Sequence, residues 1–395
     1  MRTEMTDNTL TLYLEGRIDS NNAYQLEEES LAAVAKHPGA DLAIDAKDLE
    51  YISSAGLRVL MKLRKEVKKA LPVFNVSSDI YDILDVTGFT ELLDVHKALR
   101  KISVDGCELI GSGGFGKVYR IDPETIVKIY NPQITLDMVR RERDVSQKAF
   151  LAGVPTAISY DVVRCGDCYG VVFELLNAHT VAQIMDADRS RVAEMGEKSA
   201  RLLKHLHTIE MEEGSLPSRK EELLKWLSNV ECVLEPSEVE EIRSFIQSVP
   251  DRSTFLHGDF NSKNVMIQQD GEFLLIDIGD AAIGHPVFDV ASLILPYLYL
   301  PKSTMPEEER HRLLGFKLED APKMWAAMSS TYFDTENPED VNLIAQTYMP
   351  YAQLLSSFHG TRRMNFDVDY MQRVSVPGMR QRLLPLIRQA KPLDW

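Results

Sequence analysis

The stretch Leu256-His257-Gly258-Asp259-Phe260-Asn261-Ser262-Lys263-Asn264 places a carboxylate and a carboxamide five residues apart, directly before a short apolar run. A second stretch, Leu275-Ile276-Asp277-Ile278-Gly279-Asp280, begins at the end of another apolar run. Asp270-Gly271 lies between the two runs, and Asp-Gly in that setting is typical of a β-hairpin turn. The sequence therefore predicts a hairpin whose two ends carry the polar side chains of both stretches.

Three of these side chains suit phosphoryl transfer from a nucleoside triphosphate. Magnesium bridges the phosphate oxygens and prefers hard oxygen ligands, so we expect Asp277 and the amide carbonyl of Asn264 to hold it. The attacking hydroxyl must be oriented and must lose its proton, which suits a carboxylate that is not bound to the metal, and we assign this role to Asp259. This spacing, with its Asp-x-Gly turn, resembles the catalytic and metal-binding loops of protein kinases, although Gly258 stands where those enzymes have arginine.

The size and charge of the chain limit its partners. A chain of 395 residues is expected to fold as two or more domains. The net charge of -16 argues against a nucleic-acid or membrane partner, because either would require a basic face. The sequence opens without a charged-then-apolar leader and contains no apolar run of membrane-spanning length, so we expect a soluble, cytoplasmic protein.

The cysteines do not predict a disulfide framework. Four cysteines are too few to staple a chain of this size. Cys165-Gly166-Asp167-Cys168 is a single C-x-x-C without a second pair, and we interpret it as a hairpin turn flanked by two thiols rather than as a zinc or redox site.

Residues 1–100 are predicted to form a separate α/β domain. The expected elements are strands 9–14, 42–45 and 73–76 and helices 22–36, 53–67 and 79–86. Gly16 is expected to turn the chain after the first strand. Because strands alternate with helices, we expect a sheet covered by helices.

Three segments of this domain resemble the bacterial STAS domain of anti-sigma-factor antagonists. They are Leu14-Glu15-Gly16-Arg17-Ile18-Asp19, the run from Asp48 to Leu57, and Ile83-Leu84-Asp85-Val86-Thr87-Gly88-Phe89. The resemblance implies a regulatory or docking domain with a protein partner and a phosphorylated serine at the start of the second helix. Ser54 falls at that position, whereas Ser53 stands where the family has aspartate. The alternative role of this pair is a helix N-cap, and the two roles can coexist because a helix N-terminus accommodates phosphate.

A glycine-rich segment follows the first domain. Gly111-Ser112-Gly113-Gly114-Phe115-Gly116-Lys117-Val118 fits the pattern G-x-G-x-x-G-x-V. The flanking residues predict strand, turn and strand, not the turn into a helix of a dinucleotide-binding fold. We therefore predict a flap whose backbone amides close over phosphates, with cofactor contacts at Gly111, Gly113, Gly114 and Gly116.

Lys128 lies in the apolar strand after this flap, where a lysine without a function would be costly. It matches the kinase lysine that holds the α- and β-phosphates. The helix predicted from Leu136 to Leu151 contains Glu142, which we expect to pair with Lys128, with Asp144 as its nearest alternative.

The apolar run Val171 to Leu176 ends where the adenine-binding hinge of a kinase would fall. The backbone near Glu174 to Leu176 is therefore predicted to contact the base. Two long helical stretches, 179–210 and 220–248, are expected after the hinge.

Beyond Asp277 the sequence departs from protein kinases. Only four residues separate Asp277-Ile278-Gly279 from Gly284-His285-Pro286, which leaves no room for the activation segment that holds a peptide substrate. The order of motifs from His257-Gly258-Asp259 to Phe288-Asp289 resembles the aminoglycoside phosphotransferase family, which includes choline and homoserine-type kinases. The resemblance covers residues 105–300 and implies a kinase-like fold in which Asp289 supports the catalytic loop.

We therefore expect an α/β STAS-like domain (1–100) followed by an α+β two-lobed protein-kinase-like domain, with an N-lobe (101–178) and a C-lobe (179–395). The predicted reaction uses Mg²⁺ and transfers the γ-phosphoryl group of ATP, or of GTP, to a hydroxyl of a small molecule. Helices after residue 307 are expected to wall the acceptor site. The alternative is a signalling module whose kinase domain phosphorylates Ser54 or a protein partner.

Overall fold

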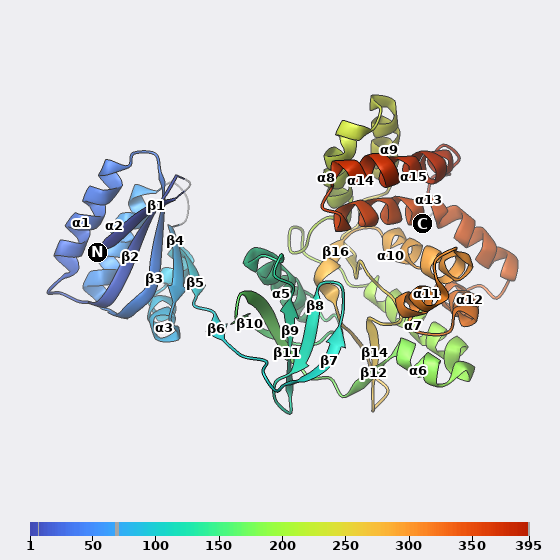
Figure 1. The fold of residues 1–395 in the computed structure, drawn as a ribbon, viewed down its shortest axis with the longest axis horizontal. Helices are drawn as coiled ribbons and strands as arrows, with labels where there is room; N and C mark the ends of the chain where they lie inside the picture. Colours follow the sequence, from blue (N-terminus) through green and yellow to red (C-terminus); the bar gives the residue numbers. More distant parts are fainter. Residues whose placement is uncertain (7, 68–70, 394–395) are drawn as a thin grey trace. The chain divides into compact units, whose positions relative to one another are not determined.

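The computed structural model describes residues 1–6, 8–67 and 71–393, and the chain divides into two compact units, Met1–Ser103 and Val104–Trp395 (Figure 1). Each unit buries its own set of apolar side chains. The first unit is α/β, and the second combines an antiparallel sheet with a helical lobe.

The first unit is a sheet in the order β1-β2-β3-β4-β5 with helices packed on it. Its elements are β1 (Arg2–Thr6), β2 (Thr9–Ile18), α1 (Ala23–Lys36), β3 (Asp41–Ile52), α2 (Ser54–Glu66), β4 (Leu71–Val76), α3 (Ser78–Val86), α4 (Phe89–Leu92), β5 (Leu93–Lys97) and β6 (Arg100–Lys101). Strands β2 to β5 run parallel, which requires the intervening helices as crossovers.

Two features of β2 differ from the sequence prediction. The turn predicted at Gly16 is wrong, because β2 continues through Gly16 to Ile18. Gly16 has φ +64° and lies where the pairing with β3 shifts register, so the glycine accommodates a bulge instead of a turn. Strand β1, which was not predicted, pairs antiparallel with β2.

The start of α2 is fixed by its cap. The Ser53 side chain accepts a hydrogen bond from the Gly56 backbone N–H at 3.5 Å, so the predicted N-cap is confirmed. A Cβ on Gly56 would lie 2.7 Å from the side chains of Ile18 and Ile52, which explains the glycine. Ser54 is the first residue of the helix and is exposed.

The N-lobe of the second unit contains an antiparallel sheet and one helix. Its elements are β7 (Glu108–Ser112), β8 (Gly116–Arg120), β9 (Thr125–Tyr130), α5 (Leu136–Leu151), β10 (Ser159–Cys165) and β11 (Cys168–Glu174). The strands lie in the order β10-β11-β9-β8-β7, and α5 packs on β10 and β11. The predicted strand, turn and strand around the glycine-rich segment are confirmed, as is the hairpin turn between Cys165 and Cys168.

The C-lobe is mainly helical, with small strands that carry the catalytic loops (Figure 1). Its strands are β12 (Ala178–Thr180), β13 (Phe255–Leu256), β14 (Val265–Gln268), β15 (Phe273–Leu275) and β16 (Ala282–Ile283). Its α-helices are α6 (Val181–Ala187), α7 (Val192–Leu206), α8 (Arg219–Val230), α9 (Pro236–Ser248), α10 (Val287–Ser292), α11 (Glu307–Leu314), α12 (Ala321–Tyr332), α13 (Pro338–Arg363), α14 (Val368–Tyr370), α15 (Val376–Gly378) and α16 (Leu384–Ile387). The predicted stretch 179–210 is therefore two helices, α6 and α7, with a break between them.

The hairpin predicted from Asp270-Gly271 is confirmed as β14 and β15, which pair antiparallel. Among the described helices, none has the length and apolar character needed to cross a membrane.

Candidate active site

The loop between β13 and β14 holds Asp259 between two carboxamides. Asn261 Nδ2 donates to Asp259 Oδ1 at 3.2 Å, and Asn264 Nδ2 donates to Asp259 Oδ2 at 3.1 Å. Both amides also donate to the Asp259 backbone carbonyl. Because the Asn264 nitrogen is fixed on Asp259, its carbonyl oxygen is directed away from that carboxylate and is available as a ligand. Asn261 was not among the predicted site residues.

The electrostatic surroundings of Asp259 suit a proton acceptor. The surrounding protein raises the pKa of Asp259 by burial, and the negative charges of Asp277 and Asp280 raise it further, while His257 opposes them. The residue still has a solvent-exposed face. A carboxylate with a raised pKa and an open face can accept a proton from a hydroxyl group.

Lys128 joins the N-lobe to the loop that carries Asp277, residues 277–280, which is the predicted metal loop. Its Nζ donates to Glu142 Oε1 at 2.8 Å and to Asp277 Oδ1 at 2.6 Å. Burial would lower the pKa of Lys128, but the carboxylates of Asp277 and Glu142 outweigh that effect and raise it. The Lys128–Glu142 ion pair thus forms as expected, whereas the alternative partner, Asp144, pairs with Arg143.

The donor set of Asn264 and Asp277 fits magnesium. Both side chains offer hard oxygen atoms, and a two-ligand protein site suits an ion that keeps several waters and takes phosphate oxygens. Within the described ranges, no group of three or more His, Cys, Asp or Glu side chains could hold a metal ion.

Asp277 and Gly279 shape the metal loop, which continues into the 3₁₀ turn η3 (Ile278–Asp280). Asp277 has φ +58° and ψ +49°, a left-handed conformation that costs free energy for a residue with a side chain. A Cβ on Gly279 would lie 2.8 Å from Glu142 Cγ, so α5 packs directly against the backbone of this loop.

The glycine flap between β7 and β8 leaves backbone groups uncovered by side chains. A Cβ at Gly113 or Gly114 would meet nothing within 4 Å, which leaves space for a ligand above them. Gly116 differs, because its Cβ would lie 2.1 Å from the Ile129 backbone oxygen. Asn131 Nδ2 donates to the Gly114 carbonyl at 2.9 Å and thereby holds the tip of the flap.

Part of the predicted hinge already forms hydrogen bonds with other residues of the N-lobe. The Glu174 side chain accepts from Ile158 N–H at 2.7 Å, and the Glu174 N–H donates back to the Ile158 carbonyl. The Leu175 N–H donates to the Glu124 carbonyl at 2.7 Å. Contact with a base would therefore use the remaining hinge groups, such as the Leu176 backbone.

Asp289 supports the loop that carries Asp259 by accepting hydrogen bonds from its backbone. Its carboxylate is 1% exposed and accepts from the backbone N–H groups of His257 at 2.8 Å and Gly258 at 2.9 Å. Burial raises the pKa of Asp289, but the hydrogen bonds from His207 and the backbone more than offset it, so the pKa is lowered. Asp289 is thus a buried anion that fixes the turn before Asp259.

His207 and Tyr332 extend this support and were not predicted. His207 Nε2 lies 3.3 Å from Asp289 Oδ2, and His207 Nδ1 lies 2.6 Å from the Tyr332 hydroxyl. No local sequence pattern predicts these contacts, because the partners lie 82 and 125 positions from His207 in the chain.

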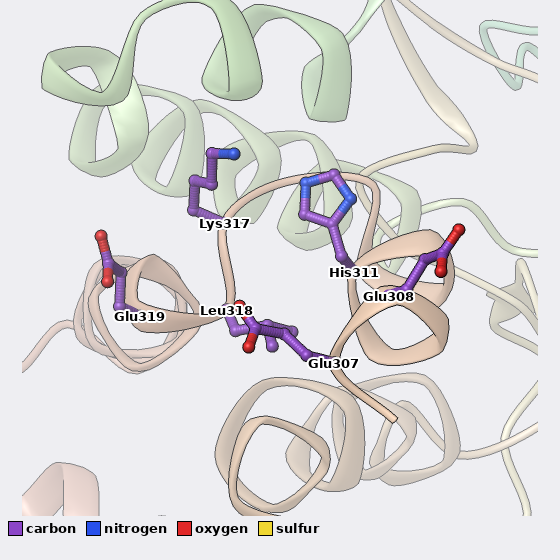
Figure 2. Close-up of a pocket in the computed structure, with 6 residues that line it drawn as sticks. All are labelled: Glu307, Glu308, His311, Lys317, Leu318 and Glu319. Atoms are coloured by element: carbon purple, nitrogen blue, oxygen red, sulfur yellow. The ribbon is translucent and has the colours of Figure 1, made fainter. Parts of the chain in front are cut away.

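A cavity of about 400 Å³ lies elsewhere on the C-lobe, at α11 and the segment after it (Figure 2). Its lining residues are Glu307, Glu308, His311, Lys317, Leu318 and Glu319. None of them is a predicted catalytic, nucleotide-binding or metal-binding residue.

Family models match both units. One described as the phosphotransferase enzyme family matches residues 107–328, and one described as the Mlab STAS domain matches residues 1–94. The anti-sigma-B factor antagonist of Bacillus subtilis (strain 168) is 34% identical over 95 residues, which are 23% of this chain and 85% of that protein. BtrV of Bordetella bronchiseptica, described as an anti-sigma factor antagonist, is 33% identical over 92 residues, which are 22% of this chain and 78% of that protein.

Solved structures give more distant similarities. The gentamicin complex of APH(2'')-IIa has 17% identity and a TM-score of 0.47, and the match covers 79% of this chain and 99% of that one. The aminoglycoside phosphotransferase APH(4)-Ia has 13% identity and a TM-score of 0.47, with 72% and 94% covered.

Proposed function

Because the chain belongs to the phosphotransferase enzyme family and its N-terminal unit to the STAS domain family, we propose that it transfers the γ-phosphoryl group of ATP to a hydroxyl of a small molecule. The observation that carries this proposal is the hydrogen bond from Asn264 to Asp259, which links the metal ligand to the base within one loop. Phosphoryl transfer depends mainly on positioning and charge stabilisation, and this hydrogen bond positions the two groups relative to each other.

Each residue has a distinct task in this reaction. Asp259 orients the acceptor hydroxyl and takes its proton, and Asn261 and Asn264 fix the two carboxylate oxygens. Magnesium, held by Asn264 and Asp277, would neutralise charge on the phosphates. Lys128 binds the phosphates and is itself held by Glu142.

The short connection after Asp277 favours a small acceptor. Residues 280–283 lead directly into Gly284. Asp280 is the last residue of η3, and residues 282–283 form the two-residue strand β16. A peptide substrate needs a platform at this point, whereas a small molecule does not. The acceptor is therefore best sought among hydroxylated metabolites and aminoglycosides.

The test compares two aspartate variants and a control. Asp259→Asn should abolish ADP formation while nucleotide affinity changes little, because the base does not hold the nucleotide. Asp277→Asn should weaken binding of magnesium–ATP. Asp167→Asn, at a fully exposed position in the β10–β11 turn, serves as the control. Undiminished turnover in the Asp259 variant would refute the assignment.

A second candidate function is phosphorylation of Ser54, in the same chain or in another copy. Ser54 is exposed at the start of α2, where a helix N-terminus accommodates a phosphate. Intact-mass spectrometry after incubation with magnesium and ATP separates the two functions. One added phosphate that maps to Ser54 and disappears in the Asp259→Asn variant supports the signalling function. An unchanged mass, with ADP released only when an acceptor is added, supports the small-molecule kinase.

A further inference from the structure

Gly258 stands where protein kinases have arginine, and the structure shows what occupies the space of the missing side chain. Gly258 has φ +81°, and a Cβ there would lie 2.1 Å from the Asp280 carbonyl oxygen and 2.5 Å from a guanidinium nitrogen of Arg219. Arg219 is the first residue of α8 and is only 4% exposed. An arginine from a distant part of the chain therefore lies against the catalytic loop.

This arginine bonds to the metal loop. Arg219 Nη2 donates to the Asp280 carbonyl at 2.6 Å, and Arg219 Nη1 lies 3.2 Å from Glu222. The guanidinium thus contacts Gly258 on one side and the last residue of η3 on the other. A buried arginine with these partners is fixed in position, because moving it would leave a charge without compensation.

A second arginine holds the same residue. Arg362, near the end of α13, donates to Asp280 Oδ1 at 2.6 Å. The Trp226 ring on α8 lies near both guanidinium groups, with its centroid 5.3 Å from Arg362 Cζ and 5.8 Å from Arg219 Cζ. Asp280 is therefore clamped through its main chain by one C-lobe helix and through its side chain by another.

The contacts of Arg219 and Arg362 with Asp280, called the clamp below, lie close to the proposed metal ligand Asp277. Asp280 ends the turn that begins directly after Asp277, and Asp277 is held in a left-handed conformation. A strained residue of this kind persists only where its surroundings fix the backbone on both sides. On the side before Asp277, the Ile276 N–H donates to the Asn264 backbone carbonyl. On the side after it, the two arginines fix Asp280.

We propose that Arg219 and Arg362 are positioning residues that hold the loop 277–280 in the conformation that presents Asp277 to magnesium-bound nucleotide. This inference rests on the proposed role of Asp277 as a metal ligand. Arg219, Arg362 and Asp280 all belong to the C-lobe. The contacts that hold the loop 277–280 therefore form without phosphorylation of any segment.

The test measures ATP affinity twice for each variant, with magnesium and with a chelator, and takes the ratio of the two affinities. Arg362→Ala and Asp280→Asn should each reduce this magnesium-dependent ratio about three- to tenfold, as expected for a partly exposed charged hydrogen bond. Affinity without magnesium should change less than about twofold, because the clamp contacts no phosphate-binding group. Arg362→Lys, which keeps a charged donor, should recover part of the loss.

Controls separate positioning from general damage. Arg380→Ala removes an exposed arginine that pairs with Glu238, and it should leave the ratio unchanged. The double variant Arg362→Ala/Asp280→Asn should lose no more than the worse single variant, because both changes break one contact. Arg219→Lys should reduce the ratio at least as much as Arg362→Ala, and if it does not fold, the Arg362 and Asp280 variants decide.

The two proposals fail in different ways. If Asp277→Asn leaves the magnesium-dependent ratio unchanged, the proposed metal site is wrong. If Asp277→Asn reduces the ratio but Arg362→Ala and Asp280→Asn do not, the clamp inference is overturned while the metal site stands. Equal loss of affinity with and without magnesium would also overturn it, because that pattern indicates general loosening of the lobe.

Discussion

Replacement of His207 by leucine should destabilise the second unit through the buried carboxylate of Asp289. The His207 side chain is 4% exposed and supplies one of the donors to Asp289, together with the backbone N–H groups of His257 and Gly258. A hydrogen bond to a charged group contributes about 1.5–3 kcal/mol. The 3.3 Å distance is long for such a bond, so we take the lower part of this range and expect a loss of about 1.5–2 kcal/mol.

Urea unfolding followed by tryptophan fluorescence measures the free energy of unfolding of the second structural unit. Residues 1–103 contain no tryptophan, whereas Trp226 and Trp325 lie in the second unit, so unfolding of the first unit does not contribute to the signal. His207→Gln keeps a donor and should lose less than half as much free energy. His205→Leu is the matched control, because His205 is exposed in the last turn of α7, which the C-cap residue His207 follows.

The loss of stability in His207→Leu should also depend on pH, and the lowered pKa of Asp289 fixes the direction of that dependence. The pKa of Asp289 is lowered in the folded protein, so its contribution to stability is complete above the unfolded pKa of about 3.9 and is lost as the pH falls through the folded value. The difference between wild type and His207→Leu should therefore be largest near neutral pH and shrink below about pH 4. A loss under about 0.5 kcal/mol, or a difference that stays constant down to about pH 3, would refute this reasoning.

Three further predictions concern other contacts. Gly279→Ala should push the Glu142 side chain off Lys128 and weaken magnesium–ATP binding about five- to tenfold, measured by calorimetry; unchanged affinity would show that the Lys128–Glu142 pair is not needed. Gly116→Ala places a Cβ 2.1 Å from the Ile129 backbone oxygen and should destabilise the N-lobe by about 2 kcal/mol or more in urea unfolding, whereas Gly113→Ala, at an open position, should not. Burial, with nearby positive charges, lowers the pKa of His285 to about 4, so wild type should lose stability as the pH falls from about 6.5 to about 4, and His285→Asn should lose less in that window.

The parts of the fold that the sequence predicted are those set by local pattern. The helix expected from Leu136 to Leu151 has these bounds in α5, because one amphipathic face and a Thr135 cap define it. Gly16 was misjudged because a glycine in a strand signals either a turn or a bulge, and only the pairing with β3 decides between them. Local pattern thus predicts elements well and interruptions within them less well.

The site shows the same division. The pairing of Lys128 with Glu142 could be predicted, because the kinase-like motif order places an acidic residue on the helix that follows the strand of Lys128. Arg219, Asn261 and His207 were missed, since their roles depend on residues brought together by tertiary packing. Arg362 lies in the helical region that was expected to wall the acceptor site, and it bonds to Asp280. The roles of the predicted site residues remain predictions that the experiments above address.

The contact between Lys128 and Asp277 has a consequence for the order in which ligands arrive. In the structure an ammonium group already neutralises the carboxylate that a metal ion would need. Free magnesium must therefore compete with a tethered cation, whereas the phosphates of an incoming nucleotide offer Lys128 an alternative anion and release Asp277 at the same moment. We expect metal and nucleotide to enter as one complex, so that the occupancy of the centre follows the concentration of that complex and responds little to free magnesium alone.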